Sequence, residues 1–309
     1  NIFIIKFIST GCDYMTLYTC KIFDSVVLYG SFVKASKALN LTPSAISHTI
    51  SALEDEMGFS LFIRTRNGVC LTRNGERLLP SIRRMLQDEE SLKQEVGQIR
   101  GVSNGTVRIG SYNSTTIRWL TKIIKSFRQK YPDIDIQVYE SGYDDIKYWV
   151  ETSVVDIAFV TKDLIPNKDV LLLYKDMLVC VTPNDFIPEN KTYITIAEIK
   201  KMPIIMQAQG SDRDTKEFLR KYNIPVQSSF HICANTSITA MVESGLGISI
   251  MPGMLFEEKP QNVNIYPIDP PEYRILGLVC SHPEAISPAA KKMREEILSF
   301  MQENDLINL

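Results

Sequence analysis

The segment GSFVKASKALNLTPSAISHTISALEDEMGFSLFIRTRNGVCLTRNGERLL, residues 30–79, decides how the amino-terminal part of the chain folds. Just before it, apolar residues recur every three or four positions over 17–29, which predicts a helix that Gly30 ends. Ser31 is placed to cap a short second helix, which carries apolar residues inward. The chain therefore begins with two short helices joined by a tight turn.

A third helix is predicted over 43–57, because Thr42 suits the cap, Pro43 suits the first helical position and Gly58 stops the helix. One face of this helix is apolar and consists of Ile46, Ile50, Leu53 and Met57. The opposite face is small, polar and uncharged at its start, and it includes Ser44, His48 and Ser51. Short hydrogen-bonding side chains let a helix backbone approach the base edges of a DNA major groove. An ordinary solvated face is the alternative interpretation.

A β-hairpin follows the third helix. Asn67-Gly68 separates the β-prone runs FSLFIRTR (59–66) and VCLT (69–72), and Asn-Gly is a strong hairpin signal. Arg64 and Arg66 stand near its tip, two positions apart and so on one face of a strand. Two arginines beside a polar helix face suit the phosphate backbone of DNA, and the alternative is a solvated hairpin.

A long helix is predicted from residue 73 to about residue 100, with Thr72 as its cap. Its seam positions alternate at spacings of four and three, as in a coiled coil. They are Leu78, Ile82, Met85, Glu89, Leu92, Val96 and Ile99. We expect this seam to pair with a second copy of the chain, and packing against the chain's own second domain is the alternative. Gly101, Asn104 and Gly105 mark a domain boundary.

Strands and helices alternate over the remaining two hundred residues. The order of the first elements is βαβαβ, with the first helix expected over about 115–130. This order predicts a parallel doubly wound sheet, and a second α/β unit follows. Two such lobes joined by crossing strands favour a ligand between them, beyond the carboxyl ends of the strands. Small polar residues gather at four of these ends: 111–116, Thr161, 207–211 and 235–237. Any one of them taken singly is better explained as a helix cap, whereas four such clusters at four strand ends together favour a ligand.

Composition and motifs exclude several classes of protein. No apolar run reaches the length of a membrane span, and no nucleophile elbow, P-loop or HExxH motif is present. The six cysteines and three histidines show no metal-ligand spacing, so no metal site is expected and the thiols are interpreted as reduced and mostly buried. Residues 1–101 carry 12 Lys and Arg against 10 Asp and Glu, while residues 102–309 carry 22 against 26. This charge difference weakly favours an anionic partner for the first part.

Residues 15–309 resemble a LysR-type transcriptional regulator of bacteria. The match is carried by the 30–79 segment, and TVRIG (106–110), VDIAFV (155–160) and VESGLGISIMP (242–252) support it by order and spacing. The resemblance implies an α/β protein with an amino-terminal winged helix-turn-helix, a long linker helix and a carboxy-terminal two-lobed α/β domain of type II periplasmic-binding-protein fold. It divides the chain into a DNA-binding domain (15–72), a dimerisation helix (73–101) and an effector-binding domain (102–309). Residues 1–14 are interpreted as an upstream extension or a cloning remnant.

The resemblance also implies site residues. The groove-facing residues and wing contacts would be Thr42, Pro43, Ser44, Ala45, Ser47, His48, Ser51, Arg64 and Arg66. The effector would meet Ser111, Asn113, Thr115, Thr161, Gln207, Asn235 and Thr236. Position 43 often holds Gln in the family and position 48 often holds Arg, so the operator preference cannot be transferred. No arginine is singled out to hold an acid, because Arg118 is interpreted as pointing outward.

The expected protein is a cytoplasmic, nucleoid-associated regulator with no catalytic residues and no cofactor. Its partners would be an operator in double-stranded DNA, further copies of itself in a dimer and a tetramer, and RNA polymerase. Its ligand would be an unidentified small effector, more easily an anion than a cation. The competing classes are a solute-binding protein and an α/β enzyme, both without DNA binding. The first should lack the 30–79 segment, and the second should show a cluster of acid, base or nucleophile.

Overall fold

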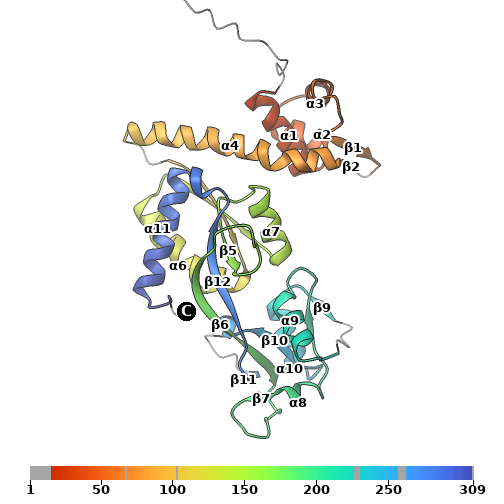
Figure 1. The fold of residues 1–309 in the computed structure, drawn as a ribbon, viewed down its shortest axis with the longest axis vertical. Helices are drawn as coiled ribbons and strands as arrows, with labels where there is room; N and C mark the ends of the chain where they lie inside the picture. Colours follow the sequence, from red (N-terminus) through yellow and green to blue (C-terminus); the bar gives the residue numbers. More distant parts are fainter. Residues whose placement is uncertain (1–14, 67, 102–103, 226–229, 257–261, 308–309) are drawn as a thin grey trace, which may run out of the picture. The chain divides into compact units, whose positions relative to one another are not determined.

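The structure is a computed structural model, and it describes residues 15–66, 68–101, 104–225, 230–256 and 262–307. The chain forms two compact units, of which the first ends at Lys93 and the second begins at Gln94. Figure 1 labels the helices and strands of both units.

The first unit is a helical domain with a hairpin. Its elements are α1 (Leu17–Tyr29), α2 (Phe32–Ala38), α3 (Pro43–Met57), β1 (Phe62–Thr65), β2 (Gly68–Leu71) and the first part of α4 (Arg73–Ile99). Thr16, Ser31 and Thr42 cap the three short helices through their side-chain oxygens. Apolar residues of all these helices and of β1 share one buried cluster. The predicted helices and hairpin are therefore confirmed.

Two contacts hold the hairpin against the helices. Glu54 of α3 accepts hydrogen bonds from the backbone N–H groups of Leu61 and Phe62, at 2.6 and 3.0 Å. At the other strand, Gly68 has φ +141° and packs so closely that an added Cβ would lie 2.6 Å from the carbonyl oxygen of Gly30. Only glycine fits there, because both the angle and the approach exclude a side chain. The hairpin of β1 and β2, which we call the wing, is thereby fixed relative to α3.

The second unit consists of two lobes that share strands. Lobe I contains β3 (Gly105–Ser111), α5 (Asn113–Thr115), a π-helical turn (Thr116–Leu120), α6 (Thr121–Lys130), β4 (Ile134–Glu140), α7 (Tyr143–Glu151), β5 (Ile157–Thr161) and α11 (Pro288–Glu303). Lobe II contains β7 (Ile194–Thr195), α8 (Ile196–Ile199), β8 (Met206–Gln207), α9 (Arg213–Lys221), β9 (His231–Ile232), α10 (Asn235–Glu243), β10 (Ser249–Pro252), a 3₁₀ turn (Gly253–Phe256) and β11 (Val263–Asp269). A short 3₁₀ turn (Pro283–Ala285) precedes α11.

The crossing strands β6 (Leu171–Pro183) and β12 (Tyr273–Cys280) join the lobes (Figure 1). The sheet order is β4-β3-β5-β12-β6-β11-β7, and β10 also pairs with β6. The β3, β4 and β5 strands are parallel, as predicted, whereas β12 runs antiparallel to β5 and β6. Along β6, residues up to Met177 pair with β12 and residues from Leu178 pair with β10 and β11. The junction of the lobes therefore lies at Asp176, Met177 and Leu178.

Two local predictions were wrong. The helix expected from Thr115 starts earlier and is interrupted by the π-helical turn, so Thr115 lies inside α5, with Tyr112 as its N-cap. The cysteines are not mostly buried: among those that the structure describes, Cys20 and Cys180 are buried, Cys280 is half-buried, and Cys70 and Cys233 are exposed. Cys12 lies outside the described residues.

Candidate DNA interface and effector pocket

The polar face of α3 is accessible. Thr42, Pro43, Ser44 and His48 are exposed, and Ala45, Ser47 and Ser51 are half-buried. Thr42 uses its hydroxyl for the cap, where it accepts from the N–H of Ala45 at 3.1 Å. The apolar face of the helix is buried in the core of the first unit. The helix thus presents short side chains outward on a rigidly packed element, which suits approach to base edges.

Arg64 belongs to the hairpin and also contacts two helices. Its Nη2 donates to the Ser47 hydroxyl at 3.0 Å, and its guanidinium lies over the ring of Phe32 at 4.9 Å. Arg66 is exposed and follows the end of β1, in the turn. The structure therefore brings one of the two predicted wing arginines directly beside the polar face of α3.

The predicted seam of α4 splits into a buried part and an exposed part. Leu78 and Ile82 pack in the core of the first unit. The exposed part consists of Met85, Leu92, Val96 and Ile99, whose exposed fractions are 38, 62, 40 and 87%. Four large apolar side chains on one side of a helix are costly in water, so this exposed part is an unpartnered apolar face.

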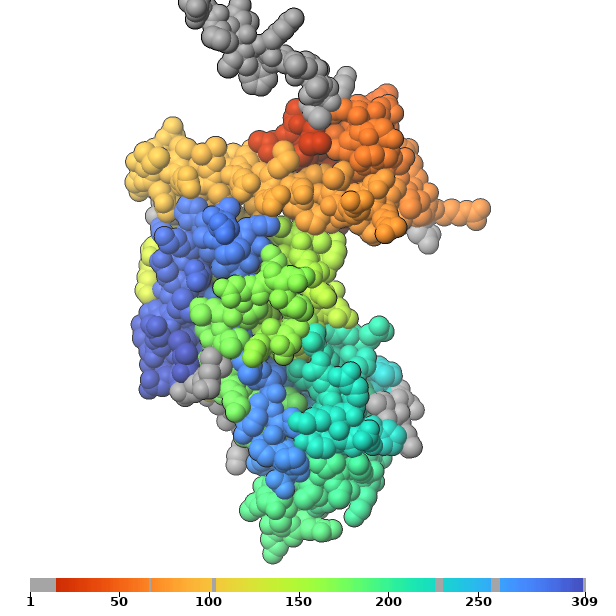
Figure 2. All heavy atoms as spheres, in the orientation of Figure 1, coloured from red at the N-terminus to blue at the C-terminus, as the bar shows by residue number. Residues whose placement is uncertain are grey.

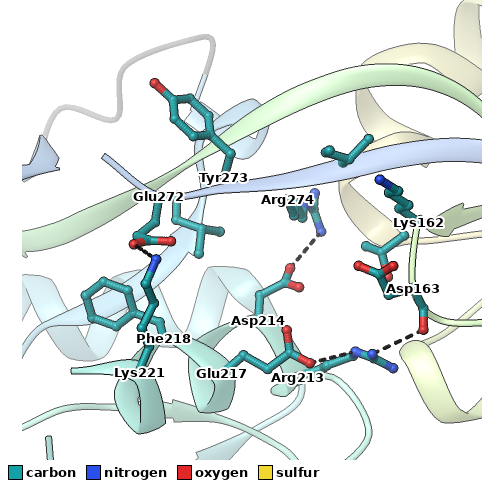
Figure 3. A pocket seen from close by; sticks show the side chains of 13 residues that line it. Lys162, Asp163, Arg213, Asp214, Glu217, Phe218, Lys221, Glu272, Tyr273 and Arg274 are labelled. Atoms are coloured by element: carbon teal, nitrogen blue, oxygen red, sulfur yellow. Dashed lines mark hydrogen bonds and ion pairs between the residues drawn. The ribbon is translucent and has the colours of Figure 1, made fainter. Parts of the chain in front are cut away.

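A pocket of about 250 Å³ lies in the second unit where the lobes meet (Figure 3). Its wall comes from the end of β5, from α9 and from the crossing strands. The lining residues are Thr161, Lys162, Asp163, Leu178, Arg213, Asp214, Glu217, Phe218, Lys221, Glu272, Tyr273, Arg274 and Ile275. Charges of both signs line it, so the pocket suits a small polar ligand.

Arg274 is the central side chain of this pocket. It is only 6% exposed and stands directly opposite Asp176 in the pairing of β12 with β6. Its Nε and Nη2 lie 2.9 and 2.8 Å from Asp176 Oδ2, while Asp176 Oδ1 accepts from the N–H of Met254 at 3.0 Å. Burial raises the pKa of Asp176, although the Arg274 charge opposes this. Both carboxylate oxygens of Asp176 are thus in use, and Asp176 is the counter-charge of Arg274 at the junction of the lobes.

The two lobes meet around the same guanidinium. From lobe I, the Ser114 hydroxyl accepts from Arg274 Nη2 at 2.8 Å, and the Tyr143 hydroxyl accepts from Nη1 at 3.2 Å. From lobe II, Asp214 Oδ2 lies 3.5 Å from Nη1 and also accepts a hydrogen bond from the Tyr143 hydroxyl. Burial alone would lower the pKa of Arg274, but the negative charges around it outweigh burial and raise it. Arg274 therefore stays charged.

Other contacts close the lobes against each other. The Tyr143 N–H donates to the Gly210 carbonyl at 2.6 Å, and an added Cβ at Gly142 would lie 2.4 Å from that oxygen. Arg213 Nη2 donates to the Asp163 carbonyl at 3.3 Å. Figure 2 shows residues of lobe II packed directly against lobe I at this place. These contacts hold the two lobes against each other.

The predicted effector residues do not converge on one surface. Ser111 and Thr115 are fully buried, and their hydroxyls lie 2.8 Å apart. Thr115 also accepts from the N–H of Tyr112 at 3.1 Å. Gln207 is buried inside lobe II, where it bonds Thr215 and the Ile250 carbonyl. These three side chains satisfy the chain's own polar groups.

The remaining predicted residues lie closer to the junction. Thr161 is the one of the seven that lines the pocket. Asn235 of lobe II donates to Asn113 of lobe I at 3.0 Å, so this pair bridges the lobes. Thr236 is exposed at the start of α10.

Sequence reasoning missed Arg274, Asp176 and Asp214. The available signal was a single charged residue in YRILGLVC (273–280), a strand that is otherwise almost wholly apolar. The arginine that was considered, Arg118, is half-buried with its Nη1 atom shielded from solvent, so it does not point outward as expected.

The described part of the chain contains neither a membrane-spanning helix nor a cluster of metal ligands. No helix there has the length and apolar character needed to cross a membrane. Likewise, no group of three or more His, Cys, Asp or Glu side chains in that part of the chain is arranged to hold a metal ion.

Comparison with known protein families defines the class. Residues 17–76 match the bacterial regulatory helix-turn-helix protein, lysR family, and residues 100–302 match the LysR substrate binding domain. The chain belongs to the LysR family of transcriptional regulators. It is therefore a DNA-binding regulator of transcription whose second domain takes a small-molecule effector, as the resemblance implied.

Individual relatives agree with this assignment. An HTH-type transcriptional regulator of Bacillus subtilis (strain 168), YvbU, is 31% identical over 283 residues, which cover 90% of this chain and 96% of the relative. A full-length OxyR point variant from Pseudomonas aeruginosa has a TM-score of 0.69 at 17% identity, with 92% of this chain and 97% of that chain covered. Full-length CbnR, solved with its target DNA, has a TM-score of 0.60 at 16% identity, with 93% and 100% covered. The two structures support the fold, and the names of the relatives describe regulators, so the expectation of a non-enzyme is confirmed.

Proposed function

We propose that this regulator binds its operator as a dimer joined along α4, and that a small metabolite in the pocket at the junction of the lobes changes that binding. The observation that carries the proposal is the wall of the pocket, which combines residues of both lobes and of the strands between them. A ligand held by two bodies has an affinity that depends on the angle between them, so binding shifts that angle.

The DNA contacts are assigned to α3 and the wing. The bases would be faced by one side of α3, which consists of Thr42, Pro43, Ser44, Ala45, Ser47, His48 and Ser51. The phosphates would be contacted by Arg64 and Arg66. The exposure of this face and the contact between Arg64 and Ser47 support this assignment. Phosphate contacts set the position on the duplex, and contacts from α3 set the sequence preference.

The assembly is assigned to the exposed face of α4. Met85, Leu92, Val96 and Ile99 would pack against the same residues of a second copy, while Leu78 and Ile82 serve the domain core. We propose further that two dimers join through their second domains into a tetramer.

RNA polymerase is proposed as a further partner, and the protein is proposed to act on the nucleoid in the cytoplasm. The functional domains would be 15–72, 73–101 and 102–309.

The effector is assigned to the pocket at the junction. Thr161 would line this pocket, and the hydrogen bond between Asn235 and Asn113 would form or break with the angle between the lobes. We assign Ser111, Thr115 and Gln207 to internal hydrogen bonds instead. A small anion is the favoured ligand, because the pocket contains Arg274 and the exposed Lys162.

A screen of metabolites for thermal stabilisation of the full chain tests this function. A compound that stabilises the protein should also change its affinity for operator DNA, since both depend on the same equilibrium. Lys162→Ala should weaken both effects, whereas Lys201→Ala, an exposed lysine of lobe II that does not line the pocket, should leave them unchanged. Equal behaviour of the two variants would contradict the assignment of the pocket.

A further inference from the structure

Two carboxylates compete for one buried guanidinium at the junction of the lobes. Asp176 already supplies a full counter-charge to Arg274, directly across the strand pair and at 2.8 Å. Asp214 of α9 lies 3.5 Å from the same guanidinium. The two carboxylates and the one guanidinium together carry one excess negative charge. Placing a second carboxylate in a buried site costs free energy unless the site offers further partners. Asp214 is therefore the more weakly held of the two.

Asp214 is also the carboxylate that can leave. It lines the pocket, and its side chain is 13% exposed against 2% for Asp176. It stands in the first turn of α9, where the helix dipole favours a negative charge whether or not Arg274 is in contact. Among the residues that the structure describes, its side chain contacts Arg274 and Tyr143, and its release would break these two contacts.

The side of Arg274 that Asp214 covers belongs to the wall of the pocket, because both residues line it. Figure 3 shows Lys162, Arg274 and Asp214 around the same opening. Lys162 is exposed, and the described residues give it no ion-pair partner. An incoming carboxylate would therefore meet Lys162 first and then the Nη1 edge of Arg274, where guanidinium and carboxylate form strong charge-assisted hydrogen bonds.

We propose that Asp214 occupies the place that a ligand carboxylate would take, so that a carboxylate effector binds Arg274 by displacing Asp214. The site rests on the proposed effector function and adds its ligand class and its resting state. Because Asp214 belongs to lobe II and its other partner, Tyr143, belongs to lobe I, displacement also removes a contact that holds the lobes together. Ligand entry is thereby coupled to the angle of the lobes.

Asp214→Asn tests the competition. The substitution keeps an oxygen that can accept from Tyr143 but removes the charge that competes for Arg274. Acetate and benzoate serve as probes, with chloride at equal ionic strength as reference, and the shift in melting temperature of the full chain gives the half-saturating concentration. We expect that concentration to fall about tenfold in the variant, because a competing internal group reduces apparent affinity by the fraction of sites it occupies. Glu243→Gln, which removes an exposed carboxylate of lobe II that does not line the pocket, should leave it unchanged.

Several results would overturn the proposal. Carboxylate binding by Asp214→Asn no tighter than by the wild type would show that Asp214 is not a competitor. Stabilisation of the wild type by methylammonium, lost in Asp214→Asn, would show that Asp214 is itself the ligand-binding group for a cation. An equal gain in Glu243→Gln would show a general charge effect.

The same samples separate this proposal from the proposed function. Operator affinity is measured with and without the carboxylate. Tight carboxylate binding by Asp214→Asn with operator affinity indifferent to it would leave the site standing and contradict the regulation. A different class of metabolite that controls operator affinity, with no carboxylate binding at all, would leave the regulation standing and overturn the site.

Discussion

At the scale of single residues, Arg64 and the polar residues of α3 should have different effects on DNA binding. Arg64→Ala should weaken binding to all sequences alike and reduce the slope of log affinity against log salt by about one unit, because one phosphate contact is lost. Ser44→Ala and His48→Ala should instead reduce the preference for operator over random DNA. Fluorescence anisotropy at several salt concentrations measures both effects. If the α3 variants weaken both DNAs equally, the helix contacts only the backbone.

Thr115 provides a second test at this scale. Thr115→Val removes the buried hydroxyl that accepts from the N–H of Tyr112 and bonds Ser111, so the variant should lose about 1–3 kcal/mol of stability. The dose–response to an effector should be unchanged, because the hydroxyl is directed into its own chain. Thermal unfolding and a reporter assay on the same variant measure the two quantities. Normal stability together with a lost response to the effector would show that Thr115 belongs to the effector site.

The residue scale also shows what a sequence can and cannot predict. The cap at Thr42, the stop at Gly58 and the hairpin at Asn67-Gly68 are local signals, and each was predicted from its neighbours; the first two are confirmed, and Asn67 itself lies outside the described residues. The Arg274–Asp176 pair joins residues 98 positions apart, and depends on a strand register that no local pattern encodes. Ser111 and Thr115 look like ligand contacts in the sequence, but their burial depends on the packing of three-dimensional neighbours. The fold was therefore more predictable than the site.

At the scale of elements, Gln94 fixes the last turns of α4 within the second unit. This side chain is 2% exposed; its Nε2 donates to the Thr106 carbonyl of β3 at 3.3 Å, and its Oε1 accepts from the N–H of Ala289 at 3.0 Å. That N–H is in the first turn of α11 and has no partner within its own helix. Gln94→Ala should therefore cost about 1–3 kcal/mol.

Chemical denaturation measures this loss for the full chain, and hydrogen exchange locates it. We expect faster exchange at the start of α11 and at the end of α4. Gln98→Ala, at an exposed position of the same helix, is the control for helix propensity. A loss of similar size in both variants would show that Gln94 does not hold the end of α4 in place.

The exposed face of α4 gives the second test at this scale. Leu92→Glu together with Val96→Glu should dissociate the dimer, because charges would face each other across an apolar seam. Gln98→Glu places a charge on the other side of the helix and should leave the mass unchanged. Sedimentation equilibrium measures the assembly. An unchanged mass for the double variant would show that the seam is not the interface.

At the level of the whole molecule, one chain joins a DNA-reading unit to a ligand-sensing unit. We propose that α3 and the wing of the first unit select particular DNA sequences. Most of the affinity of such a protein for DNA is electrostatic and independent of sequence, so binding alone does not test the claim. The preference for one sequence over another does.

The most direct measurement is capture of genomic fragments by the purified chain, followed by the affinity of the most enriched fragment and of random DNA at the same salt concentration. We predict a discrete set of fragments with dyad-related half-sites, bound at least about a thousandfold more tightly than random DNA. Retention of all fragments in proportion to their length, with equal affinity for enriched and random DNA, would show that α3 and the wing do not read the sequence.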